Sequence, residues 1–300
     1  MTDAPAVECD DLTKQFGSVT ALDGLTLEVP RGQVFGFLGP NGAGKSTTLR
    51  LLLGLIRPTS GRARVLGVDV GERRQAHQRL AYVPGDVSLW PRLSGEECLT
   101  LLGNLHGGVD DAYRRELVGR FELDLDRRSR TYSKGNRQKV ALIAAFATRA
   151  ELLLLDEPTS GLDPLMEREF QRCVHEATAR GQTVFLSSHI LSEVEDLCTR
   201  VGILRRGALV EVSEIGELRS MHSVELEADF AGSPPDLSAV DGVVGTERTP
   251  EGVRLRLAGS PRAVLAALAS TDVLAVRTRE ASLEEIFLAY YGEPDAPATP

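Results

Sequence analysis

Residues 39–47 combine glycines, a lysine and two hydroxyl side chains in an order that can bind phosphate. This segment, the phosphate loop, reads Gly39, Pro40, Asn41, Gly42, Ala43, Gly44, Lys45, Ser46 and Thr47. It fits the pattern of glycine, four residues and Gly-Lys-Ser/Thr, in which backbone N–H groups curl around an anion. Lys45 would neutralise β and γ phosphates, and Ser46 would hold Mg²⁺ through its hydroxyl. An ordinary glycine-rich turn is the alternative, and a position between a strand and a helix disfavours it.

Two adjacent acids follow the run of leucines at 152–155. Asp156 and Glu157 close this stretch, whose unbroken apolar character is typical of a buried strand. Such a strand would bring Asp156 to Mg²⁺ and Glu157 next to the γ phosphate, where it could polarise water as a general base. The acids could instead form a solvated strand end, an explanation that the phosphate loop upstream disfavours.

The elements around these motifs predict a parallel sheet. We expect strands at 33–38, 151–156 and 182–187, with helices at about 45–55 and 165–180. Because strands and helices alternate along the chain, the strands should be parallel and buried between helices.

Between the two motifs, residues of about 87–150 have mostly helical spacing, and we call this stretch the insert. Ser94 with Glu97 three residues later predicts a capping box there.

The pattern changes again after residue 220. Short strands at 224–230, 253–257 and 273–277 are interspersed with helices at about 263–270 and 283–290.

The expected fold is therefore α/β, with a phosphate-binding domain over 1–220 that contains the insert. A small α+β domain follows at 221–292, and a flexible tail at 293–300.

Composition and charge narrow the possible functions. The 300 residues are 42% apolar and 26% charged, which is typical of a globular protein of about two domains. The net charge is −9, and residues 221–300 alone carry 6 basic and 13 acidic side chains, a balance of −7. This charge repels nucleic acid, whose binding depends on neutralised phosphates. The four cysteines fit free thiols in a reducing cytosol. We expect neither a secretory signal nor a membrane-spanning segment.

Residues 132–138 and 188–189, together with the two motifs above, give the chain a specific resemblance. Over about residues 5–215 it resembles an ATP-binding cassette (ABC) ATPase subunit, which implies the P-loop NTPase ABC cassette fold. In that family a Ser-x-Gly turn caps the γ phosphate of ATP bound by the other subunit. The corresponding turn, called the signature turn here, consists of Ser133, Lys134, Gly135 and Asn136. Its serine and second glycine match the family's Leu-Ser-Gly-Gly-Gln, whereas Lys134 replaces a glycine and adds charge beside the phosphate.

The resemblance implies three further roles. His189 would contact the γ phosphate and help hold the catalytic geometry, although a structural histidine is the alternative. The interface loop, made of Ser160, Gly161, Leu162 and Asp163, would cross a dimer interface and link two ATP sites. Asp163 could equally cap a helix that starts at Pro164. Phe16 would stack on adenine, or else fill the core.

Gly85 is the main departure from the family. The family usually places at this point a glutamine that touches Mg²⁺ and the attacking water, and glycine has no side chain to do so. Asp86, one residue later, could supply an oxygen instead, or could merely face solvent.

The function that the resemblance implies is ATP hydrolysis coupled to export of a drug or other small amphiphile. Residues 282–291 resemble the closing segment of exporter ATPases, although an amphipathic helix explains their apolar positions equally. We expect a head-to-tail homodimer with ATP and Mg²⁺, on the cytoplasmic side of the cell membrane. Separate membrane-spanning permease subunits would dock near residues 82–105. Import, or a soluble ABC-type switch in translation or DNA repair, are the alternatives, and the acidic charge argues against nucleic acid.

Overall fold

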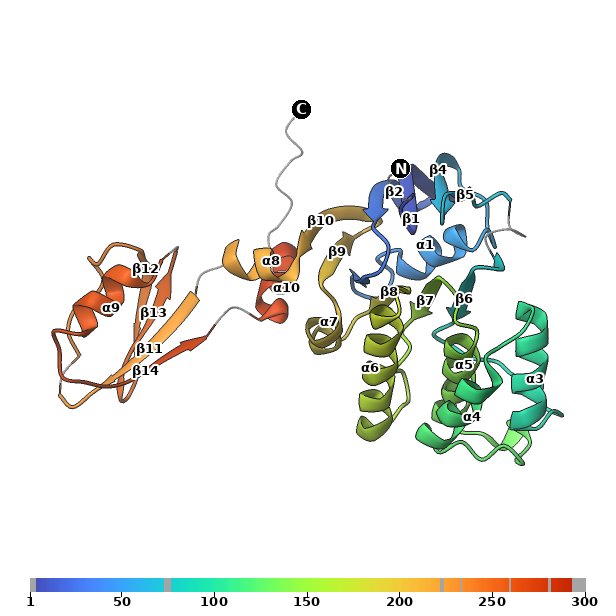
Figure 1. The fold of residues 1–300 in the computed structure, drawn as a ribbon. Helices are drawn as coiled ribbons and strands as arrows, with labels where there is room; N and C mark the ends of the chain where they lie inside the picture. The colour runs from blue at the N-terminus through green and yellow to red at the C-terminus, as the bar shows by residue number, and fades with distance from the viewer. Residues whose placement is uncertain are drawn as a thin grey trace. The chain divides into compact units, whose positions relative to one another are not determined.

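The computed structural model describes residues 4–72, 77–221, 224–232, 234–258, 260–279 and 282–292 (Figure 1). Two compact units, Met1–Val212 and Ser213–Pro300, divide the chain. The boundary in the sequence lies before residue 220, because helix α8 (Ile215–Met221) contacts α10 (Leu283–Gly292) and so belongs to the second unit. The tail expected at 293–300 lies outside the described residues. Within the described ranges, no helix has both the length and the apolar character that crossing a bilayer requires.

A six-stranded sheet forms the centre of the first unit, in the order β10-β9-β3-β8-β7-β6. Its strands are β3 (Val34–Leu38), β6 (Leu80–Val83), β7 (Leu152–Asp156), β8 (Thr183–Ser188), β9 (Arg200–Arg205) and β10 (Ala208–Glu214). The pairs β9-β3, β3-β8, β8-β7 and β7-β6 are parallel. Every residue of β3, β7 and β8 is buried, as their unbroken apolar sequences predict. Because parallel strands end at one edge, the segments after β3, β7 and β8 share that edge.

Three helices follow these strands. They are α1 (Lys45–Leu52), α6 (Pro164–Ala179) and α7 (Leu191–Leu197). α1 is shorter than the expected helix, because the chain turns at Gly54 with a φ of 61°. Asp163 caps α6 through its Oδ1, which accepts hydrogen bonds from the N–H groups of Leu165 (3.0 Å) and Met166 (3.1 Å).

Residues of the N-terminal part of the chain form a second, four-stranded sheet, in the order β2-β1-β4-β5. Its strands are β1 (Val7–Phe16), β2 (Val19–Val29), β4 (Ser60–Val65) and β5 (Val68–Asp69), all paired antiparallel. Leu12 and Leu25 from this sheet share one buried core with Phe37 of β3 and Leu49 of α1. β3, the strand that precedes the phosphate loop, is therefore held in this core.

The insert is helical, with α3 (Gly95–His106), α4 (Asp111–Arg120), a short 3₁₀ turn at Ser129–Thr131 and α5 (Lys134–Ala147). The predicted capping box is present: Ser94 Oγ accepts from Glu97 N (3.2 Å), and Glu97 Oε2 accepts from Ser94 N (2.7 Å). α4 and α5 pack together, and α5 also contacts β6 and α6. The insert therefore attaches to the parallel sheet chiefly through α5.

The second unit contains an antiparallel sheet in the order β12-β13-β11-β14. Its strands are β11 (Val224–Phe230), β12 (Val243–Arg248), β13 (Gly252–Leu257) and β14 (Val273–Arg279), with α9 (Arg262–Leu268) between β13 and β14. Leu226, Leu255 and Val264 belong to its core. In α10, Leu283 and Ile286 are buried, as an amphipathic helix requires.

Candidate functional site

The phosphate loop has a backbone that only glycines can adopt at its tightest points. Gly42 and Gly44 have φ values of 82° and 116°. A Cβ at Gly39 would lie 2.6 Å from the carbonyl oxygen of Leu204, and one at Gly44 would lie 2.7 Å from that of Ala21. Gly44 directly precedes α1, so the loop ends on the N-terminus of that helix. This arrangement suits an anion such as a phosphate chain.

Lys45 is folded back over the loop. Its side chain is buried, and Nζ donates hydrogen bonds to the carbonyl oxygens of Gly39 (2.5 Å) and Pro40 (3.3 Å). Burial lowers the pKa of Lys45, and the charges of Glu157 and Asp156 partly offset that shift. A cavity of about 150 Å³ opens here, lined by Ala21, Pro40, Asn41, Gly42, Gly44, Lys45, Ser46, Thr47 and Glu157. An ammonium group whose hydrogen bonds go to backbone carbonyls can exchange them for the oxygens of an anion in this cavity.

Asp156 and Glu157 lie beside His189, because β7 and β8 are neighbours in the parallel sheet. Asp156 is buried at the end of β7, and its Oδ1 accepts a short hydrogen bond from Ser187 Oγ of β8. Glu157 N donates to the carbonyl oxygen of Ser187 (2.9 Å). His189 Nδ1 lies 3.0 Å from Glu157 Oε1. This hydrogen bond needs a proton on Nδ1 when the carboxylate is ionised.

Glu157 occupies a strained backbone conformation. Its φ is 46°, which is unusual for a residue with a Cβ. Strain of this kind persists where neighbouring structure enforces it, and it is concentrated at functional sites. The turn directs the Glu157 carboxylate into the cavity that Lys45 and Ser46 line.

Oxygen ligands for a divalent cation are present at this edge of the sheet. Ser46 supplies a hydroxyl in the cavity and Asp156 a buried carboxylate at the end of β7. Among the described residues, no group of three or more His, Cys, Asp or Glu side chains could hold a metal by itself. The Ser46 hydroxyl and the Asp156 carboxylate are hard oxygen donors, the kind that Mg²⁺ takes from a protein when phosphate and water complete its shell.

The signature turn lies against the interface loop of the same chain. Ser133 caps α5, and its Oγ accepts from Asn136 N (3.2 Å). Lys134 Nζ donates to Ser160 Oγ (2.5 Å). A Cβ at Gly135 would lie 2.4 Å from the carbonyl oxygen of Gly161, so glycine is required for this approach. Neither segment lines the cavity at Lys45.

Phe16 lies on the surface at the end of β1. Its side chain is 49% exposed, with Lys14 Nζ 4.9 Å from the ring centroid. An exposed ring does not fill the core, so the structure excludes that alternative for Phe16, and the Lys14 ammonium group lies over the ring.

Gly85 lies against the backbone of the acidic strand end. A Cβ there would be 3.2 Å from the carbonyl oxygen of Asp156. Asp86 is exposed and lines a different cavity, of about 320 Å³, together with Arg130 and Arg137. In this structure Asp86 is therefore not part of the cavity at Lys45.

The sequence interpretation missed three polar residues that hold the site. Ser187 binds Asp156 as described above. Gln138 of α5 is 1% exposed, and its Nε2 donates to the carbonyl oxygen of Pro158 (2.9 Å). Glu193 of α7 is also buried, beside Ser188. A polar residue on the buried face of a helix was the available signal for Gln138 of α5 and Glu193 of α7.

Family membership agrees with this geometry. Residues 22–160 match the ABC transporter family. With full-length similarity to curated members as well, the chain belongs to the ABC transporter ATP-binding proteins.

Two curated relatives and two solved structures illustrate the similarity. The daunorubicin/doxorubicin resistance ATP-binding protein DrrA of Streptomyces peucetius is 35% identical, over 96% of this chain and 93% of the relative. The bacitracin transport ATP-binding protein BcrA of Bacillus licheniformis is 37% identical, over 74% of each chain. A solved ATP binding subunit of an ABC transporter has a TM-score of 0.67 and 31% identity, over 71% of this chain and 92% of that one. CbiO1 of Clostridium perfringens, at 22% identity and a TM-score of 0.61, shares the fold.

Proposed function

We propose that this chain hydrolyses ATP to drive export of a drug or other small amphiphile through separate membrane subunits. The observation that carries the ATPase proposal is the meeting of the phosphate loop, Glu157 and His189 at one edge of the parallel sheet. Lys45 and Glu157 line the same cavity, and His189 is hydrogen-bonded to Glu157 at 3.0 Å. A phosphate-binding cation and an oriented carboxylate are the two parts that attack by water on a phosphate requires.

Each residue has a distinct task in this mechanism. Lys45 would exchange its bonds to Gly39 and Pro40 for phosphate oxygens. Glu157 would accept a proton from the attacking water, and His189 would hold the carboxylate in place. Ser46 and Asp156 would hold Mg²⁺, which when bound withdraws charge from the β and γ phosphates. Phe16 would stack on the adenine.

Ser133 and Lys134 of the signature turn are exposed, and the turn does not line the chain's own phosphate cavity. We therefore assign it to the ATP of a second copy, in a head-to-tail homodimer. The N-terminal N–H groups of α5, and Lys134, would face the γ phosphate bound by the partner. The interface loop would accompany the turn, since Lys134 and Gly135 contact it.

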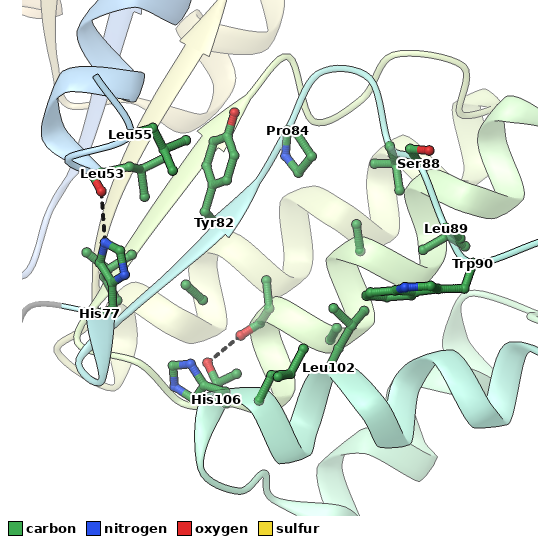
Figure 2. Close-up of a pocket in the computed structure, with 18 residues that line it drawn as sticks. Leu53, Leu55, His77, Tyr82, Pro84, Ser88, Leu89, Trp90, Leu102 and His106 are labelled. Carbon is green, nitrogen blue, oxygen red and sulfur yellow. Dashed lines mark hydrogen bonds between the residues drawn. The ribbon is translucent and has the colours of Figure 1, made fainter. Parts of the chain in front are cut away.

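A large apolar groove supports the proposed membrane partner (Figure 2). It has a volume of about 430 Å³ and is lined by residues after α1, around β6 and on α3 and α5. Leu55, Trp90 and Leu105 expose 60%, 45% and 69% of their surface there. Eight residues of the stretch 82–105, at which docking is expected, line the groove: Tyr82, Pro84, Val87, Ser88, Leu89, Trp90, Leu102 and Leu105. We propose that a short amphipathic helix of a permease subunit occupies it.

The substrate class and the cellular location rest on the relatives. DrrA and BcrA are named for daunorubicin/doxorubicin resistance and bacitracin transport. We extend this class of cargo, a bulky amphiphilic drug or antibiotic, to the present chain. The protein would then lie on the cytoplasmic face of the cell membrane, held by its permease.

The test is Mg²⁺-dependent phosphate release by the purified full chain and by Lys45→Ala. We expect the wild-type protein to release phosphate only with Mg²⁺, and the variant to lose about a hundredfold or more in rate, because the phosphate charge is no longer neutralised. Arg172→Ala, which removes an exposed cation of α6, is the matched control. No Mg²⁺-dependent release by the wild type, or equal rates for Lys45→Ala, would overturn the proposal.

A further inference from the structure

Glu193 is a buried carboxyl group with no part in the mechanism above. It lies on α7, and only 7% of its surface is exposed. Its Oε2 accepts a hydrogen bond from Ser188 Oγ at 2.7 Å. Its Oε1 is buried without a hydrogen-bond partner among the described residues. A buried carboxyl group with incomplete partners destabilises a fold, and an apolar side chain would pack the same face of α7 at lower cost.

Ser188 connects Glu193 to the histidine turn. It is the last residue of β8 and directly precedes His189. Its Oγ accepts a hydrogen bond from Ile190 N (3.0 Å), so the Ser188 side chain spans the residue that carries the imidazole. Because Glu193 holds the same hydroxyl, it fixes the start of this turn. The far side of the turn places His189 Nδ1 3.0 Å from Glu157 Oε1.

A second neighbour of the Glu193 carboxyl group belongs to the segment that follows Glu157. Thr159, two residues after Glu157, is buried, and its hydroxyl lies close enough to Glu193 to favour the charged carboxylate, without a hydrogen bond to Oε1. Burial raises the pKa of Glu193, while the hydroxyls of Ser188 and Thr159 favour its charged form. Glu167 of α6 also raises this pKa, and His189 lowers it. Glu193 therefore lies between the segment that follows Glu157 and the turn that presents His189.

We propose that Glu193 is a positioning residue for ATP hydrolysis, which holds the His189 turn against Glu157 through the Ser188 hydroxyl. This inference rests on the proposed ATPase function. Glu193 touches neither nucleotide nor water in this role. It acts through His189, so its loss should lower the rate of the chemical step and leave ATP binding nearly unchanged.

The experiment measures kcat and KM for ATP in the full chain for Glu193→Leu, Glu193→Gln and Ser188→Ala. We expect Glu193→Leu and Ser188→Ala to lower kcat about tenfold and to change KM by less than about twofold. Glu193→Gln keeps an oxygen acceptor for Ser188 and should recover most of the rate. Asp196→Asn, on an exposed position of the same helix, is the matched control and should behave as wild type.

Combination with His189→Ala separates positioning from a purely structural role. If Glu193 acts through His189, adding Glu193→Leu to His189→Ala should lower kcat no further. Multiplied losses in the double variant, a change in KM that matches the loss in kcat, or an unchanged kcat in Glu193→Leu would each overturn the inference. Should Glu193→Leu fold poorly, Ser188→Ala with and without His189→Ala gives the same test. Absence of hydrolysis by the wild type would instead remove the proposed function.

Discussion

At the scale of single residues, Lys134 is the departure from the family pattern that adds a charge to the signature turn. It stands in the first turn of α5, where an acid would complement the helix and a cation does not. Its ammonium group is exposed and hydrogen-bonded to Ser160 Oγ of the interface loop. A cation at this end of a helix adds to the attraction for an anion, which suits the triphosphate of a second copy.

Removal of this charge should affect association and leave folding unchanged. We expect Lys134→Met to weaken ATP-dependent dimerisation about three- to tenfold, because one exposed charge facing phosphate contributes at this level. The melting temperature should stay within about 1 °C, since an exposed contact adds little to stability. Light scattering against ATP concentration measures the first quantity and a thermal melt the second, with Arg172→Met as the control. Equal dimerisation by Lys134→Met and wild type would show that this lysine does not face the partner's nucleotide.

At the scale of elements, Arg120 and Tyr113 connect α4 of the insert to α6 of the parallel-sheet core. Arg120 Nε lies 3.0 Å from Glu169 Oε2, and its Nη1 lies 2.9 Å from Glu176 Oε2. The Tyr113 hydroxyl also donates to Glu176 Oε2 at 3.1 Å. Hydrogen bonding by Arg120 is the main reason that the pKa of Glu176 is lowered. The ion pair thus joins the insert to α6, the helix that follows β7 of the parallel sheet.

Arg120→Met should destabilise the fold by about 1–2 kcal/mol, a range that allows for the partial exposure of Glu176. The folded-state pKa of Glu176 is lowered, so the ion pair contributes stability above the unfolded-state pKa of about 4.3 and loses it as pH falls further. Denaturant unfolding of both proteins at pH 7 and near pH 3 measures this, with Arg115→Met on the same helix as control. A stability difference that does not shrink at low pH would contradict the assignment.

Elements with a regular pattern of apolar residues could be predicted from the sequence, and elements whose pattern is interrupted could not. Buried parallel strands such as β7 are continuous apolar runs, and their positions follow from the pattern. β1 was missed because Asp10 and Asp11 interrupt its alternation. The strand accommodates them with irregular pairing and a φ of 49° at Asp11. The phosphate loop is recognisable because one short segment makes it. The contacts of Gln138 and Glu193 join separate elements, and only the packed structure specifies them.

At the scale of the whole molecule, each copy of the chain would contribute one half to each of the two proposed ATP sites. The phosphate loop, Glu157 and His189 line or border one cavity, while the signature turn lies outside it. In the proposed homodimer, a second copy with the opposite orientation would complete each site. ATP would then bridge the copies, and hydrolysis would remove the bridge. This switch between association and release is the central claim of the account.

The most direct test is the oligomeric state of Glu157→Gln with Mg²⁺ and ATP. The substitution removes the proton acceptor and keeps the shape of the side chain and the phosphate-binding groups. We predict that the variant forms a stable ATP-dependent dimer by light scattering and releases phosphate at least about a hundredfold more slowly than wild type. Glu157→Gln with Lys45→Ala should stay monomeric and serves as the control. A Glu157→Gln protein that remains monomeric in ATP, or that hydrolyses it at the wild-type rate, would contradict the account.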